Sequence, residues 1–341
     1  MSTTKYRLIT RSDFDGLVSA VLLKELGIID EIMFVHPKDM QDGLIAVTDR
    51  DITTNLPYVE GVHLAFDHHS SEMKRLSDAD MLAQSQKKYI TVPHAPSTAR
   101  VIYDYYGGKA RFVGIPDDLM RAVDRADSAY YEIEDILSPK DWTLLNFIMD
   151  SRTGLGRFRD FKVSNKQLMM DMIEYCRHFP VEKILNMPDV KERIDLYHEH
   201  NLLAKQQLHR CTRLEGEIAI IDFADETPIY ACNRFLVYAM FPQATVSIHR
   251  IMNATKDKIV FAVGKSIVNR RSRAVIGNIM LEYGGGGHDA AGTCQIDLAE
   301  AERVLEEIKE KLHDAGASGV GIGRFLSKIK NRMIRAISGR T

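Results

Sequence analysis

The sequence predicts an α/β protein with a parallel-sheet N-terminal domain, a helical linker and a smaller α/β domain after it. In the first part of the chain, short apolar segments alternate with segments of helical spacing, which predicts a parallel sheet. From about residue 139 to 214 the chain is rich in Leu, Met, Lys, Glu and Arg, which indicates helices. From about Glu217 strands and helices alternate again, and 341 residues suffice for two or three domains. We therefore divide the chain into residues 1–150, 151–214, 215–314 and 315–341.

The elements of the N-terminal domain follow from their local patterns. Helical spacing predicts a helix that Gly27 ends, and Pro116 is expected in the first turn of a later helix. The predicted helices are 17–27, 98–106 and 116–127. Apolar runs predict the strands, which are 6–10, 32–36, 44–48 and 62–66.

The rest of the chain gives a second set of elements. Pro180 and Pro188 interrupt the helices of the linker region. The segment 150–161, with three arginines and two glycines, is either a lid, a substrate loop or a helix connection. The predicted strands of the smaller domain are 217–222, 227–231, 244–252 and 258–266, and its helices are about 271–283 and 299–313.

The composition is that of an ordinary globular protein, with 45% hydrophobic and 27% charged residues. The four cysteines form no CxxC pair, which disfavours a disulfide framework and a thiolate zinc site and fits a reducing cytoplasm. The N-terminus has no apolar signal core, and no apolar run is long enough to span a bilayer. We therefore expect a cytoplasmic protein.

The charge is distributed unevenly, although the net value is only −2. Residues 315–341 contain six basic residues and no acid, and the remaining chain has 39 basic and 47 acidic residues, a net charge of −8. An acidic body disfavours a long nucleic acid as partner. The tail has an apolar face, so it suits a membrane surface or a nucleic acid, but docking onto its own protein or onto a homodimer partner is favoured.

Acidic and histidine side chains follow several predicted strands. In an open parallel sheet the ligand crevice lies at the carboxyl ends of the strands, so these side chains are expected to converge. Each acid alone is more simply a helix cap or turn residue, but their shared position favours a metal site. Asp and His without Cys suit Mn²⁺, Mg²⁺ or Fe²⁺, and a carboxylate can bridge two such ions. The side chains are Asp13 and Asp15, Asp51, then Asp67, His68 and His69, and Asp127 from a helix end.

A glycine run at 283–296 follows a basic segment at 264–273. Consecutive glycines let backbone N–H groups approach an anion, and the arginines and His288 can bind phosphate. The alternative is a flexible turn beside a solvated basic edge. A glycine run alone is not specific for this role, but the histidine and the arginines beside it favour phosphate binding.

Together these motifs resemble the DHH phosphoesterase family over about residues 5–312. The resemblance rests on DFDG at 13–16, Asp51, DHH at 67–69, Asp127 and GGGGH…AAG at 284–292. It implies a parallel α/β catalytic domain, a linker and a smaller α/β domain, with the active site in the cleft between them. It also implies a manganese-dependent phosphoesterase, with Mg²⁺ as the alternative metal.

The resemblance also implies the roles of single residues. Asp51, preferred over Asp49, would bridge two metals. Asp15, His68 and Asp127 would complete one metal site, with Asp124 as a weaker rival of Asp127, and Asp13 would belong to the other site.

The remaining roles concern the substrate. Asp67 would orient His68, His69 would donate to the scissile phosphate, and a water activated by the metal would attack. The substrate's far phosphate or base would be held by Ser266, Asn269, Arg270, Gly285, Gly286, Gly287 and His288.

The chain departs from the family pattern at Arg11. Family members usually carry a His or Asp ligand there or at the position of Ile9. The first metal site is therefore expected to be firm, and the second either binds weakly and arrives with substrate or is replaced by the Arg11 guanidinium.

The predicted function is metal-dependent hydrolysis of a short linear phosphate ester, foremost a linear dinucleotide such as pGpG or nano-RNA, to mononucleotides. The first alternative is an exopolyphosphatase or a phosphatase of the phosphoadenosine-phosphate type. The second is a non-catalytic nucleotide-binding protein, in which Arg11 marks the loss of catalysis.

Overall fold

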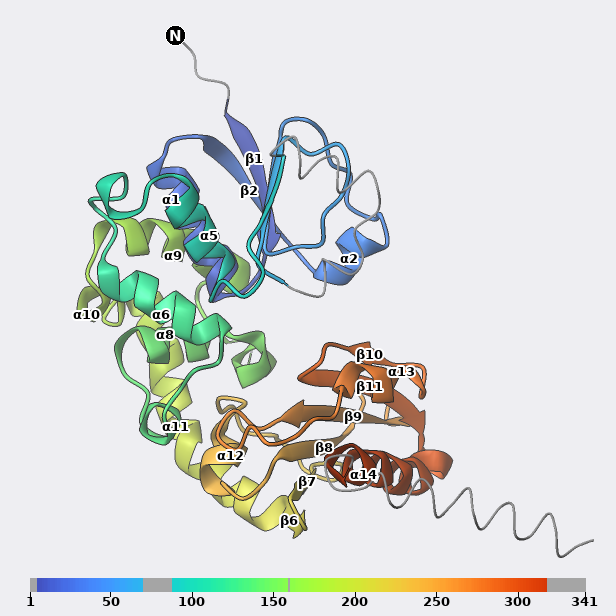
Figure 1. Cartoon of the computed structure of the whole chain (residues 1–341). Coiled ribbons are helices and arrows are strands. Elements are labelled where there is room, and N and C mark those ends of the chain that lie inside the picture. Colours follow the sequence, from blue (N-terminus) through green and yellow to red (C-terminus); the bar gives the residue numbers. More distant parts are fainter. Residues whose placement is uncertain (1–4, 70–87, 159, 318–341) are drawn as a thin grey trace, which may run out of the picture. The chain divides into compact units, whose positions relative to one another are not determined.

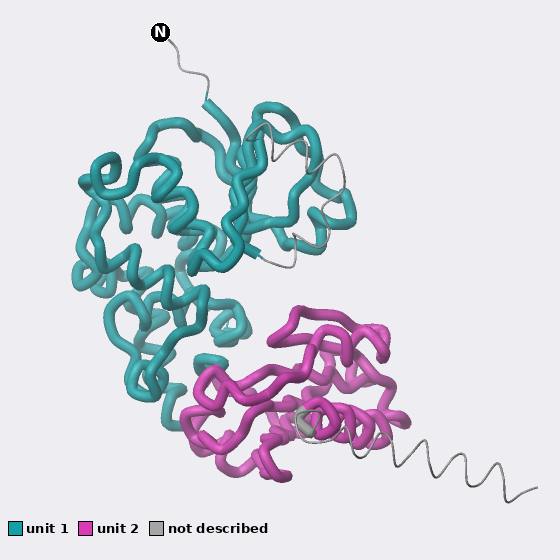
Figure 2. The backbone as a smooth tube through the Cα atoms, in the orientation of Figure 1, with its two compact units in different colours: residues 1–202, 231–234 teal, residues 203–230, 235–341 magenta. Residues whose placement is uncertain are grey.

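The computed structural model describes residues 5–69, 88–158 and 160–317. The chain forms two compact units, which Figure 2 shows in two colours. The first unit comprises Met1–Leu202 and Ala231–Arg234, and the second comprises Leu203–Tyr230 and Phe235–Thr341. The predicted basic tail lies outside the described residues from residue 318 onward.

The first unit is built on a parallel sheet, as the sequence predicts, and the sheet has five strands, of which β5 was not predicted. The strands pair in the order β2-β1-β3-β4-β5, and every pairing is parallel. The order reverses at β1, so the crevice beside the carboxyl ends of β1 and β3 is the expected ligand site of such a sheet. The strands are β1 (Tyr6–Arg11), β2 (Ile29–Val35), β3 (Asp51–Thr54), β4 (Leu64–Asp67) and β5 (Tyr89–Thr91).

Helices cover both faces of this sheet (Figure 1). Leu8 belongs to the large core shared with α1, whereas the next residue, Ile9, packs with Met40 of α2 on the other face. Helix α1 is apolar on nearly all sides and ten of its residues are buried, as expected of a helix packed between a sheet and other helices. The helices of the unit are α1 (Phe14–Glu25), α2 (Pro37–Gln41), α5 (Thr98–Tyr105), α6 (Asp117–Asp127), α7 (Ile133–Leu137), α8 (Asp141–Met149), α9 (Asn165–His178), α10 (Val181–Ile184) and the first part of α11 (Pro188–Cys211).

The second unit contains a mixed sheet of six strands in the order β10-β11-β9-β8-β7-β6. Only the β7–β8 pair is parallel. Its core includes Ile248, Phe261, Met280 and Ile308. The elements are β6 (Thr212–Glu215), β7 (Ile218–Asp222), α12 (Leu236–Met240), β8 (Val246–Met252), β9 (Lys258–Lys265), α13 (Ile276–Leu281), β10 (Gly286–Gly287), β11 (Ala291–Asp297) and α14 (Ala301–Ala317).

Two predicted strands are wrong. The segment 44–48 is not a strand: Leu44 is 71% exposed, and Ile45 and Val47 pack from a loop against the α2 side of the sheet. The strand of this region is the polar, fully buried Asp51–Thr54. The segment 227–231 is not a strand either, because Pro228 has no N–H and side chains of α11 accept the N–H groups of Tyr230 and Ala231.

The other predicted elements differ from the structure mainly at their ends. Helix α1 begins at Phe14, three residues earlier than predicted, because Asp13 caps it by accepting the Gly16 N–H at 2.9 Å. Pro116 is the N-cap of α6 rather than a residue of its first turn.

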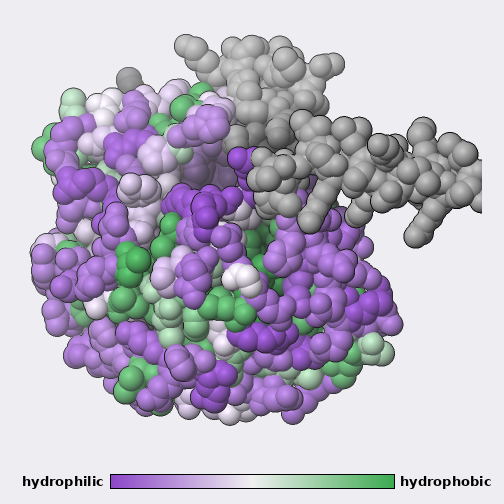
Figure 3. Space-filling view, turned by 60° about the horizontal axis from the view of Figure 1, so that its bottom comes forward, coloured by the Kyte–Doolittle hydropathy of each residue, from purple (hydrophilic) through white to green (hydrophobic). Residues whose placement is uncertain are grey.

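The surface is mostly hydrophilic on the face that Figure 3 shows, with smaller areas of apolar residues. Among the described residues, no helix is long and apolar enough to cross a membrane.

Candidate metal centre

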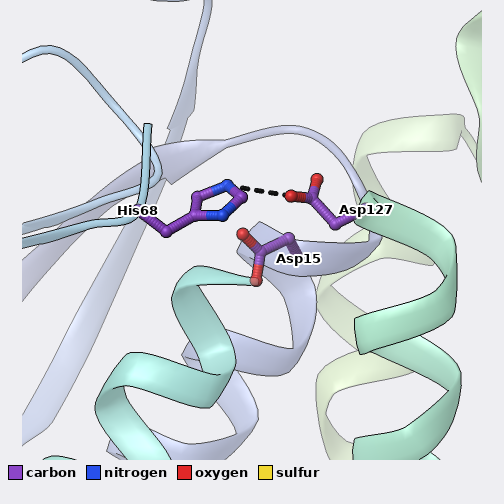
Figure 4. A group of neighbouring side chains, drawn as sticks. All are labelled: Asp15, His68 and Asp127. Carbon is purple, nitrogen blue, oxygen red and sulfur yellow. Dashed lines mark ion pairs between the residues drawn. The ribbon is translucent and has the colours of Figure 1, made fainter. Parts of the chain in front are cut away.

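Three predicted ligands come together in the first unit. The ligand atoms of Asp15, His68 and Asp127 all lie within 4.8 Å of one another. Asp15 is in the first turn of α1, His68 follows β4, and Asp127 is the last residue of α6. Figure 4 shows the three side chains pointing toward one another.

Backbone groups fix two of these side chains. The Asp15 carboxylate is buried and accepts the N–H groups of Thr98 at 2.9 Å and Ala99 at 2.7 Å, at the start of α5. The His68 Nδ1 atom lies 2.8 Å from the Ala95 carbonyl oxygen, so Nδ1 carries the proton when the ring is neutral. This leaves the His68 Nε2 lone pair for a metal, in the manner of many metal-binding histidines.

The remaining geometry also suits a cation. His68 Nε2 lies 2.8 Å from Asp127 Oδ2, yet among the described residues this buried nitrogen has no aligned hydrogen bond. Two carboxylates and one imidazole carry a net charge of −2 when the ring is neutral, which matches a divalent ion. Three protein donors also leave coordination positions for water and substrate. The residues therefore fit a divalent metal.

The charges of the three groups influence one another strongly. Burial, together with the Asp127 carboxylate, raises the pKa of Asp15 to about 7. Burial alone would lower the pKa of His68, but the Asp127 and Asp15 carboxylates raise it to about 10. Burial would raise the pKa of Asp127, but His68 lowers it below its usual value. Without a metal, the cluster therefore retains protons that an ion would displace.

We expect the metal-free protein to lose stability as the pH rises. Folded Asp15 keeps its proton up to about pH 7 and folded His68 up to about pH 10, above their ordinary pKa values of 3.8 and 6.5. In these windows the folded state binds more protons than the unfolded state, so the free energy of unfolding falls with pH. Thermal unfolding of EDTA-treated protein between about pH 5 and 9 measures this. Asp15→Asn should flatten the lower half of the profile, and a melting temperature that rises with pH would contradict the expectation.

Asp67 orients His69 and not His68, so the predicted role of Asp67 is corrected. Asp67 Oδ1 lies 2.8 Å from His69 Nδ1, whereas the partner of His68 Nδ1 is the Ala95 carbonyl oxygen. Asp67 is fully buried at the last position of β4. Burial alone would lower the pKa of His69, but the Asp67 carboxylate raises it above its usual value. His69 therefore holds a proton on Nδ1 against Asp67 and presents Nε2 to its surroundings.

Asp51 is not a metal ligand in this structure, and its predicted bridging role is wrong. It is the first residue of β3, opposite Arg7 at the start of β1, so it lies at the other end of the sheet from His68. Its carboxylate pairs with Arg7 Nε at 2.7 Å and accepts the Thr48 N–H at 2.6 Å. The error follows from placing the strand at 44–48, before Asp51 instead of after it.

The residue at the carboxyl end of β3 is Asn55, which the sequence reasoning missed. It is 2% exposed and has a positive φ of 56°, a conformation that asparagine tolerates better than most residues. Its Nδ2 donates to Asp13 Oδ1 at 3.1 Å. The signal was an asparagine directly after a short β-branched run, Ile52–Thr54.

The two rival acids have other roles. Asp49 lies in the exposed turn before β3. Asp124 accepts the Ser97 hydroxyl at 2.8 Å and pairs with Arg100 at 2.7 Å, so it stabilises the start of α5. Asp127 is therefore a better ligand candidate than Asp124.

Asp13 lies beside the three clustered ligands but is not among them. Its carboxylate caps α1 and pairs with Arg11 Nε at 2.9 Å. Burial raises the pKa of Asp13, and the Arg11 guanidinium opposes this. The predicted second-metal ligand is thus already occupied by protein groups.

A second basic group near this site was only partly recognised from the sequence. The segment 150–161, for which a lid, a substrate loop or a helix connection was predicted, begins with two short 3₁₀ helices. Arg152 pairs with Asp150 at 2.7 Å and also attracts Asp13 and Asp127 electrostatically. Arg234, distant in sequence, lies 3.5 Å from the same Asp150.

The predicted substrate-binding residues lie in the second unit, around the end of β9. The Ser266 hydroxyl accepts the Asn269 N–H at 2.9 Å, and Arg270 Nε donates to the Ile267 carbonyl at 2.9 Å. Gly286 and Gly287 pair with β11, and the His288 N–H donates to the Ala291 carbonyl at 2.7 Å. The β9–β11 pairing brings Lys265 and Asp289 into an ion pair at 2.7 Å.

Close packing requires part of the glycine run. A Cβ on Gly285 would lie 2.0 Å from the Thr293 carbonyl oxygen, whereas one on Gly286 would meet nothing within 4 Å. The hairpin therefore needs glycine at Gly285 for packing alone. Anion binding by this turn, with Gly286, Gly287 and His288, stays a prediction.

Comparison with solved structures gives one strong similarity. The chain is 49% identical to the pGpG-specific phosphodiesterase PggH from Vibrio cholerae, with a TM-score of 0.80 and coverage of 92% of this chain and 100% of that chain. CDC45 from Entamoeba histolytica is 10% identical, with a TM-score of 0.47 and coverage of 92% and 95%. RecJ in complex with Mn²⁺ from Thermus thermophilus is 13% identical, with a TM-score of 0.40 and coverage of 92% and 52%. No protein-family model matches the chain, and the search of curated proteins gives no match.

Proposed function

The chain belongs to the DHH phosphoesterase family, and we propose that it is a phosphodiesterase that hydrolyses the linear dinucleotide pGpG to mononucleotides. The observation that carries this proposal is the similarity to PggH along the whole length of that chain. The Asp15, His68 and Asp127 cluster supports it independently, because it offers the donors of a hydrolytic metal site.

The reaction consumes one water, which adds to phosphorus, and it breaks the bond between phosphorus and the leaving ribose oxygen. Asp15, His68 and Asp127 would hold the ion. When bound, a divalent metal would polarise the phosphate oxygens and lower the pKa of a water. Backbone groups of α5 and of Ala95 hold the Asp15 and His68 side chains, so this part of the site is ordered before substrate arrives.

His69 would act on the phosphate from beside this site. Its ring meets the His68 ring edge to face, with centroids 4.4 Å apart. Because Asp67 binds Nδ1 and raises the pKa of His69, the ring can donate a proton from Nε2 to a phosphate oxygen or to the leaving ribose oxygen.

Two arginines supply positive charge for the substrate. Arg11 and Arg152 both lie within electrostatic reach of Asp127. In a site with three carboxylates, Asp13, Asp15 and Asp127, these guanidinium groups would reduce repulsion of the phosphodiester and pair with its oxygens.

The second unit carries the residues that we propose for binding a phosphate or a base. Ser266, Asn269 and Arg270 lie at the end of β9, and the turn of Gly285, Gly286, Gly287 and His288 pairs beside it through β11. Backbone N–H groups and a guanidinium suit a terminal phosphate or a guanine edge.

Manganese is the metal that we propose, with Mg²⁺ as the alternative. An imidazole beside two carboxylates binds Mn²⁺ more readily than Mg²⁺, which prefers oxygen ligands alone. Because none of the three donors is a cysteine, this cluster is not a structural thiolate zinc site.

An assay panel with Mn²⁺ tests the proposed substrate. We expect pGpG to be converted to GMP, while cyclic dinucleotides, polyphosphate and phosphoadenosine phosphate remain largely intact; chromatography of the products measures this. Turnover confined to polyphosphate would contradict the proposal. Nucleotide binding without turnover of any substrate would instead favour the non-catalytic alternative.

A further inference from the structure

Arg11, Asp13 and Asn55 meet at the point where the order of the parallel sheet reverses. Arg11 is the last residue of β1, Asp13 caps α1, and Asn55 follows β3. Strands β1 and β3 are neighbours, with Thr10 opposite Thr54. This group therefore lies in the crevice of the sheet, within electrostatic reach of Asp127.

Protein groups already surround the Asp13 carboxylate. Oδ1 accepts the Gly16 N–H at 2.9 Å and Asn55 Nδ2 at 3.1 Å, and Oδ2 lies 2.9 Å from Arg11 Nε. The Arg11 guanidinium competes with any cation for this carboxylate, and Arg11 and Asp13 together carry no net charge. The position lacks the charge that holds a divalent ion beside Asp15, His68 and Asp127.

Asn55 follows β3 and lies beside Asp13, and its neutral amide cannot bridge two ions as a carboxylate can. Its Nδ2 points to Asp13, and the opposite assignment of the amide would place two acceptor oxygens together. Asn55 is 2% exposed, and its Oδ1 has no partner among the described residues. A buried, unpartnered acceptor at this crevice is suited to a hydrogen bond from water or from substrate.

Arg11 keeps most of its hydrogen-bonding capacity for another partner. Only its Nε is paired with Asp13 among the described residues, and its side chain is 31% exposed. The two terminal nitrogens form a planar fork that matches two oxygens of one phosphate. Asp13 thus fixes the position of the guanidinium through Nε and leaves the two terminal nitrogens for another partner.

We propose that this enzyme uses one divalent ion and that Arg11, positioned by Asp13, takes the place of a second ion in neutralising the scissile phosphate. Asn55 completes the replacement, because its amide supports Asp13 and cannot bridge two metals. This inference rests on the proposed function and specifies how its site is built.

Counting bound metal tests the proposal without any activity measurement. Equilibrium dialysis of the full chain against Mn²⁺, followed by elemental analysis, should give one ion per chain. The double variant Arg11→His with Asn55→Asp introduces a histidine and a carboxylate, and it should bind two. Two ions on the native chain, or one on a correctly folded double variant, would overturn the proposal. Absence of any bound ion would instead contradict the proposed function itself.

A second measurement tests the phosphate contact and does not depend on the double variant folding. Arg11→Lys keeps the charge but loses the fork, so we expect one ion per chain still and about tenfold weaker binding of GMP by calorimetry. Asp13→Asn should weaken GMP binding in the same direction, because it releases the guanidinium. Unchanged GMP affinity in both variants would overturn the role of Arg11.

Discussion

Replacing His68 by alanine is expected to lower the turnover of pGpG by about a thousandfold or more and to abolish Mn²⁺ binding. His68 Nε2 is the only nitrogen donor of the three-residue cluster. Without it, the Asp15 and Asp127 carboxylates remain close together in a buried place with nothing between them, so one of them will take up a proton. The site then loses both a ligand and the charge that attracts the ion.

The neighbouring histidine provides the matched control. His69→Ala should also lower turnover, but it should leave Mn²⁺ binding nearly unchanged, since His69 is bound to Asp67 and not to the cluster. Calorimetric titration of both variants with Mn²⁺ separates the two roles. Normal Mn²⁺ binding by His68→Ala would place the metal elsewhere.

Asp67→Asn is the second large effect that we expect, with kcat lowered by about a hundredfold to ten-thousandfold. An asparagine of the same shape carries no charge, so it no longer stabilises a protonated His69, although its carbonyl oxygen can still accept the Nδ1–H. The neutral ring would then have no proton on Nε2, where the phosphate needs it.

The metal affinity of this variant distinguishes the observed geometry from the arrangement that the sequence predicted. If Asp67 oriented His68, its loss should weaken Mn²⁺ binding by about ten- to a hundredfold. Because Asp67 instead contacts His69, we expect the affinity to stay within about twofold of the native value while kcat falls. A drop in affinity that accounts for the lost turnover would contradict this assignment.

Most of the first sheet could be predicted because its strands and helices have strong apolar patterns. Strand β1 and helix α1 stand out in YRLIT and LVSAVLL, and the DHH run begins at the end of β4. Strand β3 could not be recognised in this way, since Asp51–Thr54 has one aliphatic residue and is nevertheless fully buried. A neighbouring apolar loop was therefore chosen instead, and Asp51 was assigned to the wrong end of the sheet.

Some of the site residues could be predicted from the sequence in the same way, and others could not. Asp15 and His68 could be predicted because each follows a predicted strand, whereas Asp127 was predicted from a helix end, and the family resemblance grouped the three into one metal site. The partner of Asp67 could not, because two adjacent histidines follow it and only side-chain distances choose between them. Asn55 and Arg152 were also out of reach, since neither belongs to a recognisable ligand motif. Asn55 contacts Asp13, and Arg152 attracts Asp13 and Asp127 electrostatically, and these partners are distant in sequence.

Anomalous diffraction from a crystal soaked with Mn²⁺ tests the account most directly. We predict one strong peak, bounded by a carboxylate oxygen of Asp15, Nε2 of His68 and a carboxylate oxygen of Asp127, with Arg11 still paired to Asp13. A peak bound to Asp51, or no peak within bonding distance of His68, would contradict the proposed metal centre.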